Sequence, residues 1–211
     1  MIGKFRLYIF DLDGTLVDSA IDICGAIQQV LHDSGRADVP DALLRLYIGR
    51  HLLDLFSDLG FPPEAIDPMI ASYRSIYHAR GHANTQVFPG VAQMLATLGG
   101  MKSTATTKGT PMTRIVLEKF GLLSFFKHVQ GTDGFPAKPK PDVILKSLDI
   151  LGVSPQECLM VGDSASDMEA GRLAGVKICG VTYGYGDLVA MERFNPDYWI
   201  DHPSDLTEPL S

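Results

Sequence analysis

The sequence has few of the features that mark secreted, membrane or metal-stapled proteins. Three cysteines are scattered over 211 residues without a CxxC pair, which predicts neither a disulfide framework nor a zinc site. No uninterrupted apolar run approaches the roughly 18 residues of a membrane span, and the apolar part of the N-terminus is too short for a signal peptide. We therefore expect no membrane partner and a reducing, cytoplasmic location.

Positive charge is also scarce. Lysine and arginine total 18 against 25 aspartates and glutamates, which gives a formal charge of −7. A protein that binds nucleic acid without sequence preference needs a cationic face, so the composition argues against a nucleic-acid partner. A small anionic substrate is still possible, because a few local cations or a metal ion can hold one. Apolar residues make up 45% of the chain, typical of a globular protein with a sizeable core.

Residues 17–87 differ in composition from the rest of the chain. They contain nine acidic residues and five arginines but no lysine, whereas all nine lysines lie outside this segment. Apolar residues recur there at helical spacing, which predicts helices over residues 19–34, 41–59, with a break near Gly49, and 63–80. The segment contains no clear strand, so we expect it to be all-helical.

The rest of the chain alternates between short apolar strands and helices of about 10–15 residues, a pattern typical of a parallel, doubly wound sheet. The expected strands span residues 5–10, 102–106, 128–131, 158–161 and 176–181, and the expected helices span residues 89–98, 110–120, 141–151 and 164–174. We therefore predict an α/β fold, in which a Rossmann-like core of residues 1–16 and 88–211 carries an inserted helical domain of residues 17–87.

Two aspartates stand at the carboxyl end of the first expected strand. Asp11 and Asp13 follow a buried apolar run, at the edge where open parallel sheets bind their ligands. Alternate residues of a strand share a face, so the two carboxylates either converge or are separated in role by the turn that Gly14 permits. The alternative is a strand terminator followed by an ordinary Asp-Gly turn, which explains two aspartates at this spacing less well.

A second pair of aspartates, Asp163 and Asp167, follows the strand expected at residues 158–161. Ser164 and Asp167 have the spacing of a capping box, so Asp167 alone could serve the N-terminus of the next helix. That explanation does not extend to Asp163. Carboxylates at neighbouring strand ends repel each other unless a cation lies between them, and oxygen ligands completed by water suit Mg²⁺.

Two further segments carry hydroxyl or cationic candidates. Thr106 and Thr107 end the strand expected at residues 102–106, and Lys138 precedes a helix in the sequence Lys-Pro-Lys-Pro. An ordinary strand-end hydroxyl and a solvated loop lysine are the alternatives. The flanking prolines favour a functional lysine, because they fix the loop geometry that positioning an ammonium group requires.

In combination, these segments resemble the haloacid dehalogenase-like (HAD) phosphohydrolases over nearly the whole chain. The matching elements, in order, are the DxDGT element from Asp11 to Thr15, the strand-end hydroxyl at Thr106, the lysine before Pro-x-Pro at Lys138, and the GDxxxD element that contains Asp163 and Asp167. The helical segment after the first element resembles the first type of cap domain in that family. The stretch of residues 180–186 and the Thr106-Thr107-Lys108 element are similar to phosphoglycolate phosphatases, which usually carry asparagine where this chain has Thr107.

The resemblance implies a mechanism with an aspartyl-phosphate intermediate. Its catalytic residues would be Asp11 as nucleophile, Asp13 as general acid and base, Thr106 as a phosphoryl ligand and Lys138 as a counter-charge. Mg²⁺ would be held by Asp11, the backbone carbonyl of Asp13, and Asp163. Asp167 would orient Lys138 or a metal-bound water, and Gly14 and Thr107 would support the site.

Single residues separate this chain from some relatives. Asp13 argues against the dehalogenases, which lack the second aspartate, and the absence of lysine from residues 17–87 argues against phosphonatases, which use a cap lysine. For the cap, Arg50 and His51 are the expected specificity residues, with Arg80 and His82 as a second pair. The alternative is that these four are solvated cations at helix ends.

We therefore expect a Mg²⁺-dependent phosphatase for a small phosphorylated metabolite, with phosphoglycolate as the leading substrate. A pyrophosphatase, nucleotidase or sugar phosphatase of the same fold is an open alternative. A regulatory protein that binds phosphate without turnover is another. The sequence makes no prediction about the oligomeric state.

Overall fold

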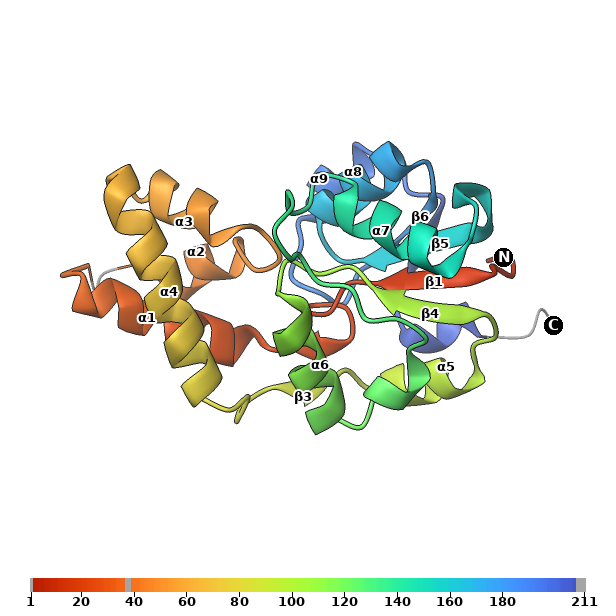
Figure 1. Cartoon of the computed structure of the whole chain (residues 1–211), viewed down its shortest axis with the longest axis horizontal. Helices are drawn as coiled ribbons and strands as arrows, with labels where there is room; N and C mark the ends of the chain where they lie inside the picture. The colour runs from red at the N-terminus through yellow and green to blue at the C-terminus, as the bar shows by residue number, and fades with distance from the viewer. Residues whose placement is uncertain (1, 37–38, 208–211) are drawn as a thin grey trace.

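A computed structural model describes residues 2–36 and 39–207, and its centre is a parallel five-stranded sheet (Figure 1). The strand order is β4-β1-β5-β6-β7. The strands are β1 (Leu7–Phe10), β4 (Met101–Thr104), β5 (Cys158–Gly162), β6 (Lys177–Val181) and β7 (Tyr198–Ile200). Phe10 pairs with Thr104 on one side and Val161 on the other, so β1, β4 and β5 end together. The strand order reverses around β1, which places its carboxyl end where parallel sheets bind ligands.

Helices cover both faces of the sheet, as the doubly wound pattern predicts (Figure 1). Tyr8 and Phe10 point into one hydrophobic cluster, and Leu7 and Ile9 point into another, because successive strand residues face opposite sides. The helices of the first face are α5 (Val91–Thr97) and α6 (Thr110–Lys119), and those of the second are α7 (Asp142–Leu151), α8 (Ala165–Ala174) and α9 (Leu188–Glu192). Three short 3₁₀ helices complete this part: η1 (Leu123–Phe125), η2 (Pro155–Glu157) and η3 (Pro203–Leu206).

One expected strand of this part is wrong, and β7 and α9 were not predicted. Residues 128–131 form no strand, and their only ladder contact is a single bridge between Gly131 and Thr106. The side-chain hydroxyl of Thr104 instead bonds to both the N–H and the carbonyl of Gln130 at 2.9 Å, and so replaces the strand ladder there. Strand β7 and helix α9 carry too short a pattern to be predicted.

Helices α1 to α4, between residues 18 and 86, form a separate helical body beside the carboxyl edge of the sheet (Figure 1). Its helices are α1 (Ala20–Asp33), α2 (Asp41–Arg45), α3 (Leu52–Asp58) and α4 (Pro63–Ala79). They pack around a hydrophobic cluster of their own, which includes Ile27, Leu31, Phe56 and Ile70. The break expected near Gly49 is present between α2 and α3.

The two chain crossings into this helical body are paired with each other. Strand β2 (Val17–Asp18) and strand β3 (Gln86–Val87) form a short antiparallel ribbon, in which Val17 pairs with Val87. No strand was expected in residues 17–87. Two-residue strands are too short to produce a recognisable alternation of apolar and polar residues. No helix within the described residues combines the length and the apolar character needed to cross a membrane.

Asp22 fastens helix α1 to the segment that returns toward the sheet. Its buried carboxylate accepts hydrogen bonds from the backbone N–H and side chain of Asn84 and from the hydroxyl of Thr85, at 2.8–3.0 Å. Arg80 Nε lies 3.7 Å from the same carboxylate. Burial alone would raise the pKa of Asp22, but these partners outweigh burial and lower it.

We expect Asp22→Ala to lower the free energy of unfolding by about 1–3 kcal/mol at neutral pH, because buried donors lose their acceptor. Since the folded-state pKa is lowered, this stabilisation is present above the unfolded-state pKa and is lost as the pH falls through the folded-state value. Urea unfolding followed by circular dichroism measures the change. Asp67→Ala, at an exposed position on α4, is the control, and equal effects of the two substitutions would contradict the assignment.

Candidate active site

Three buried carboxylates meet where β1 and β5 end. Asp11 directly follows β1, Asp163 directly follows β5, and Asp167 lies in the first turn of α8. One carboxylate oxygen from each lies within 4.8 Å of the others. The Asp11 N–H donates to the carbonyl of Val161 at 2.9 Å, so the sheet ladder fixes the first of these side chains relative to β5. The two sequence elements that were expected to converge therefore do so.

Lys138 lies inside this carboxylate group. Its Nζ is 2.9 Å from Asp11 Oδ1 and 2.5 Å from Asp167 Oδ1, and its side chain is fully buried. The peptide bond that joins Lys138 to Pro139 is cis. Burial disfavours the ammonium form, yet the two carboxylates outweigh burial and raise the pKa of Lys138 above its usual value. The lysine is therefore charged and serves as the internal counter-ion.

One cation does not neutralise three carboxylates. Burial raises the pKa of Asp11 well above its usual value and raises that of Asp163 to about 7, and repulsion from Asp167 adds to both shifts. Asp11 Oδ2 is buried and has no hydrogen-bond partner among the described residues. Partially desolvated oxygen donors with one unused lone-pair site suit a hard divalent cation such as Mg²⁺.

Asp167 has two roles that the sequence analysis treated as alternatives. Its Oδ2 accepts hydrogen bonds from the N–H of Ser164 at 3.0 Å and from the Ser164 hydroxyl at 2.6 Å, which completes a capping box at the start of α8. Its other oxygen contacts Lys138. The cap of the helix thus holds the carboxylate in the orientation in which it meets the lysine.

Asp13 lies apart from the three-carboxylate group. Ser19 Oγ donates to its Oδ1, and Lys108 Nζ contacts its Oδ2, both at 2.5 Å. The two aspartates of the first element therefore have different partners, since Asp11 contacts Lys138. Neither Ser19 nor Lys108 was among the residues expected in the site, although Lys108 follows Thr107 directly and Ser19 lies only six residues after Asp13.

Gly14 and Thr15 contact Asp163, whereas Thr106 and Thr107 lie beside Lys108. Gly14 has φ of 86°, and a Cβ on it would run into the Asp163 carboxylate, so no other residue fits. Thr15 Oγ1 donates to Asp163 Oδ1 at 3.2 Å. Thr106 is buried, and its hydroxyl accepts from the N–H of Lys108 at 3.3 Å, while Thr107 lines the adjoining cavity.

Tyr185 links the carboxylate group to the start of the helical body, a connection that the sequence analysis did not predict. Its backbone N–H donates to Asp163 Oδ2 at 2.8 Å. Its hydroxyl accepts from the N–H groups of Ser19 and Ala20 and donates to Asp18 Oδ1. The glycines on either side approach Asp163 closely, which explains why this loop is rich in glycine.

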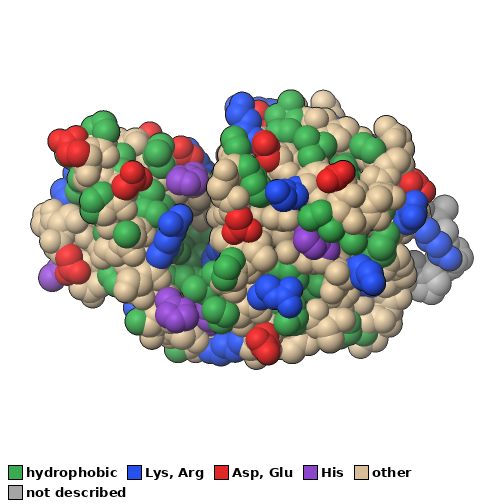
Figure 2. Space-filling view, viewed as in Figure 1, with side chains coloured by type: hydrophobic (Ala, Val, Ile, Leu, Met, Phe, Trp, Pro, Cys, Tyr) green, Lys and Arg blue, Asp and Glu red, His purple; other side chains and the backbone are tan. Residues whose placement is uncertain are grey.

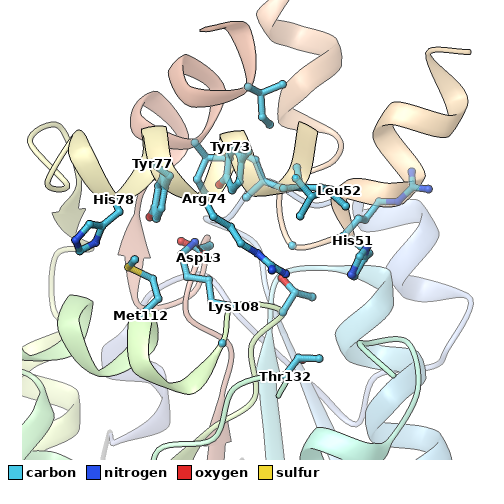
Figure 3. A pocket seen from close by; sticks show the side chains of 18 of the residues that line it. Asp13, His51, Leu52, Tyr73, Arg74, Tyr77, His78, Lys108, Met112 and Thr132 are labelled. Atoms are coloured by element: carbon cyan, nitrogen blue, oxygen red, sulfur yellow. Dashed lines mark hydrogen bonds and ion pairs between the residues drawn. The ribbon is translucent and has the colours of Figure 1, made fainter. Parts of the chain in front are cut away.

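A cavity of about 590 Å³ opens between the helical body and the sheet. Figure 3 shows its inner surface, with Asp13, Lys108 and Thr132 on one side and Tyr73 and Tyr77 of α4 on the other. The two sides touch, because Lys108 Nζ lies 4.6 Å from the centre of the Tyr77 ring. Figure 2 shows the hollow from outside, with basic side chains at its edge.

Two of the four expected specificity residues line this cavity. Arg50 lies 3.8 Å from Asp54 and 3.9 Å from Asp58, and its guanidinium packs over the Tyr47 ring at 4.5 Å. His51 caps α3, where its Nδ1 accepts from the N–H of Leu53 at 3.1 Å. Both therefore already have partners within the helical body.

Arg80 and His82 are not among the residues that line the cavity. Arg80 lies against Asp22, and buried His82 packs edge-on against Tyr77 with ring centroids 5.0 Å apart. The cation that the sequence analysis missed is Arg74 of α4, which Figure 3 shows reaching from the helix toward Lys108 and Thr132. The packing of α4 determines that the Arg74 side chain points into the cavity. No sequence motif predicts this direction.

Comparisons with known proteins identify the family of this chain. The haloacid dehalogenase-like hydrolase family model matches residues 8–181. A phosphoglycolate phosphatase of Aquifex aeolicus is 33% identical over 211 residues, covering 96% of this chain and 95% of that protein. Phosphoglycolate phosphatase 1 of Pseudomonas aeruginosa is also 33% identical, over 95% of this chain and 78% of that protein.

The fold has solved counterparts as well. A haloacid dehalogenase-like family hydrolase of Streptococcus pneumoniae superposes with a TM-score of 0.90 at 27% identity, covering 96% of both chains. A hydrolase of Pseudomonas syringae superposes with a TM-score of 0.81 at 26% identity, covering 95% of both. The match extends over most of the chain in sequence and over nearly all of it in structure. The chain therefore belongs to the haloacid dehalogenase-like hydrolase family and is an enzyme of the hydrolase class.

Proposed function

We propose that this protein is a Mg²⁺-dependent phosphatase that hydrolyses small organic phosphomonoesters through an aspartyl-phosphate on Asp11. Phosphoglycolate is the leading substrate, because the relatives named above carry that activity in their names. The observation that supports the proposal most strongly is Asp11 itself. It lies at the end of β1 with one oxygen on Lys138 and the other without a partner.

In the first step, a carboxylate oxygen of Asp11 attacks phosphorus, and the bond from phosphorus to the ester oxygen breaks. Lys138 contacts Asp11 through Oδ1 and orients its carboxylate. The leaving alkoxide takes a proton from Asp13, whose carboxyl group faces the cavity. Ser19 and Lys108 hold that carboxyl group in place.

In the second step, water attacks the phosphorus of the aspartyl-phosphate and releases Asp11. Asp13 now accepts a proton from that water, which returns both residues to their starting state. Thr106 and the backbone N–H groups after Asp11 bind the phosphoryl oxygens. Lys138 offsets the negative charge on Asp11 and on the transferring group, and without such charge the cluster would repel a phosphate dianion.

The residues that would hold Mg²⁺ are Asp11, Asp163 and the backbone carbonyl of Asp13. The closeness of buried carboxylates and the unpartnered Asp11 Oδ2 support this assignment. When bound, the ion would shield the charges of carboxylate and phosphate and orient them toward each other. Asp167 is already bonded through both oxygens, so we assign it to orienting Lys138.

The test is hydrolysis of p-nitrophenyl phosphate with Mg²⁺ and with a chelator, followed by a panel of phosphorylated metabolites. We expect turnover only with Mg²⁺ and a preference for phosphoglycolate over nucleotides, pyrophosphate and sugar phosphates. Binding of phosphate without turnover of any phosphomonoester would favour the regulatory alternative. A flat profile across the panel would leave a general phosphatase and remove the assignment to phosphoglycolate.

A nucleotidase or sugar phosphatase is the second candidate, and the cavity volume favours it. A volume of about 590 Å³ equals that of roughly twenty water molecules at about 30 Å³ each. That number is about twice the number of non-hydrogen atoms in phosphoglycolate. Isoleucines and tyrosines of the helical body make up much of the wall. A preference for a nucleoside monophosphate or a sugar phosphate in the same panel would support this candidate.

Binding of Mg²⁺ is expected to weaken as the pH falls below about 7. Burial raises the pKa of Asp163 to about 7, so the metal-free protein loses stability as the pH rises through this value, and Mg²⁺ must displace a proton below it. Calorimetric titration should show an affinity that decreases up to about tenfold per pH unit below that pKa. Asp163→Asn removes the titrating group, and a pH-independent affinity in the unmodified protein would contradict the prediction.

A further inference from the structure

The cationic side chains around the cavity are not equivalent. Arg50 lies just before α3 and is paired with Asp54 and Asp58 of that helix, and Lys108 is paired with Asp13. His51 is engaged as the cap of α3. Arg74 differs, since it forms no hydrogen bond and no ion pair with any residue in the described ranges 2–36 and 39–207.

Arg74 occupies the face of α4 that forms one wall of the cavity. Ile70, Tyr77 and His78 lie three or four residues away along the helix and line the same wall, as does the neighbouring Tyr73. Figure 3 shows the Arg74 side chain leaving α4 and crossing toward Lys108 and Thr132 on the opposite side. Its guanidinium group therefore lies in the cavity that Asp13 also lines.

The acidic residues of the cavity do not neutralise Arg74. Asp13 is bonded to Ser19 and Lys108. Asp133 Oδ1 accepts the N–H of Thr110 at the start of α6. Arg74 is solvent-exposed at the cavity wall. A guanidinium group that faces an open, partly apolar cavity without a counter-ion attracts an anion, and its planar fork matches a carboxylate in two parallel hydrogen bonds.

We propose that Arg74 binds the carboxylate of a substrate that carries both a phosphomonoester and a carboxylate group, and so selects acidic phosphomonoesters over neutral ones. The proposal rests on the proposed phosphatase function and identifies the residue that sets its specificity. Phosphate would face Asp11 and Lys138, and the acid group would face α4. Arg50, the arginine expected from sequence, keeps its partners within the helical body.

The test compares phosphoglycolate with ethyl phosphate, which has a methyl group in place of the carboxylate. We expect Arg74→Gln to lower kcat/KM for phosphoglycolate by about 10- to 100-fold and to change that for ethyl phosphate less than about threefold. Arg74→Lys should restore part of the preference, because it keeps the charge but not the fork. Arg45→Gln, an equal loss of charge at an exposed position outside the cavity, should leave both values unchanged.

A binding measurement makes the result independent of turnover. In the Asp11→Asn background, calorimetry should show that Arg74→Gln weakens phosphoglycolate binding by a similar factor. Equal losses for both esters, or no loss for either, would overturn the role of Arg74 while leaving the phosphatase function intact. Absence of any Mg²⁺-dependent turnover in the unmodified protein would instead overturn the proposed function, and the binding comparison would still decide on Arg74.

Discussion

Replacing Asp11 with asparagine is expected to lower kcat by at least about 10⁴-fold, the scale seen when a catalytic nucleophile is removed. The amide oxygen of asparagine is a poor nucleophile, and the other residues of the site cannot substitute for it. Asp163 is held by Thr15 and Tyr185, and Asp167 is held by Ser164 and Lys138. Steady-state hydrolysis of p-nitrophenyl phosphate with Mg²⁺ measures the loss.

The same substitution should leave the fold intact. Burial raises the pKa of Asp11 well above its usual value, which means that the folded protein holds the ionised form at a cost in stability. A neutral amide of the same shape removes that cost, and Lys138 keeps Asp167 as its partner. We therefore expect an unchanged circular dichroism spectrum and an equal or higher melting temperature. Retained turnover in a folded Asp11→Asn protein would overturn the nucleophile assignment.

Replacing Lys138 with methionine is expected to affect stability and activity together. Lys138 is the internal counter-ion of Asp11 and Asp167, and its side chain has no exposure to solvent. Breaking a buried ion pair by removing one partner costs about 3–5 kcal/mol, since the remaining charge stays buried and unpaired. Turnover should also be lost, because Asp11 would be neither oriented nor kept ionised.

Urea unfolding and Mg²⁺-dependent hydrolysis measure the two effects. Lys140→Met is the matched control, because it removes the same charge from an exposed position two residues later in the same loop. That control should change stability by less than about 0.5 kcal/mol. If Lys138→Met retained both stability and turnover, the lysine would be neither the counter-ion nor a part of the site.

The sequence predicted the meeting of distant residues well, for a geometric reason. Asp11 and Asp163 each follow a buried parallel strand, and parallel strands end at the same edge of a sheet. Once β1 and β5 are recognised, their closeness follows without any knowledge of the loops. The same reasoning does not give the direction in which Asp13 points, because a turn with positive φ at Gly14 follows it.

The cavity residues were harder to predict from sequence. Four arginines besides Arg74 lie in residues 17–87, and their composition and spacing do not distinguish them. Which one faces the substrate depends on how α4 packs across the cavity and on which partners the others find. Lys108 and Tyr185 belong to the two elements that resemble phosphoglycolate phosphatases. Their contacts with Asp13 and Asp163 nevertheless arise only from tertiary packing.

The fold was predicted in element order but not in every element. Strong apolar strands such as β5 were located to within a residue, because their burial leaves a continuous apolar run. The expected strand at residues 128–131 was wrong, since the Thr104 hydroxyl takes over its main-chain hydrogen bonds. The division of the chain into a core and an inserted cap remains a proposal, which the separate hydrophobic cluster of the helical body supports.

Trapping the covalent intermediate decides whether Asp11 is the nucleophile. The protein would be mixed with Mg²⁺ and a phosphomonoester, quenched in acid within the first turnover, and digested for mass spectrometry. We expect one phosphoryl group on the peptide that contains Asp11, and none in Asp11→Asn. Rapid turnover without a phosphorylated protein, or a phosphoryl group on any residue other than Asp11, would contradict this assignment.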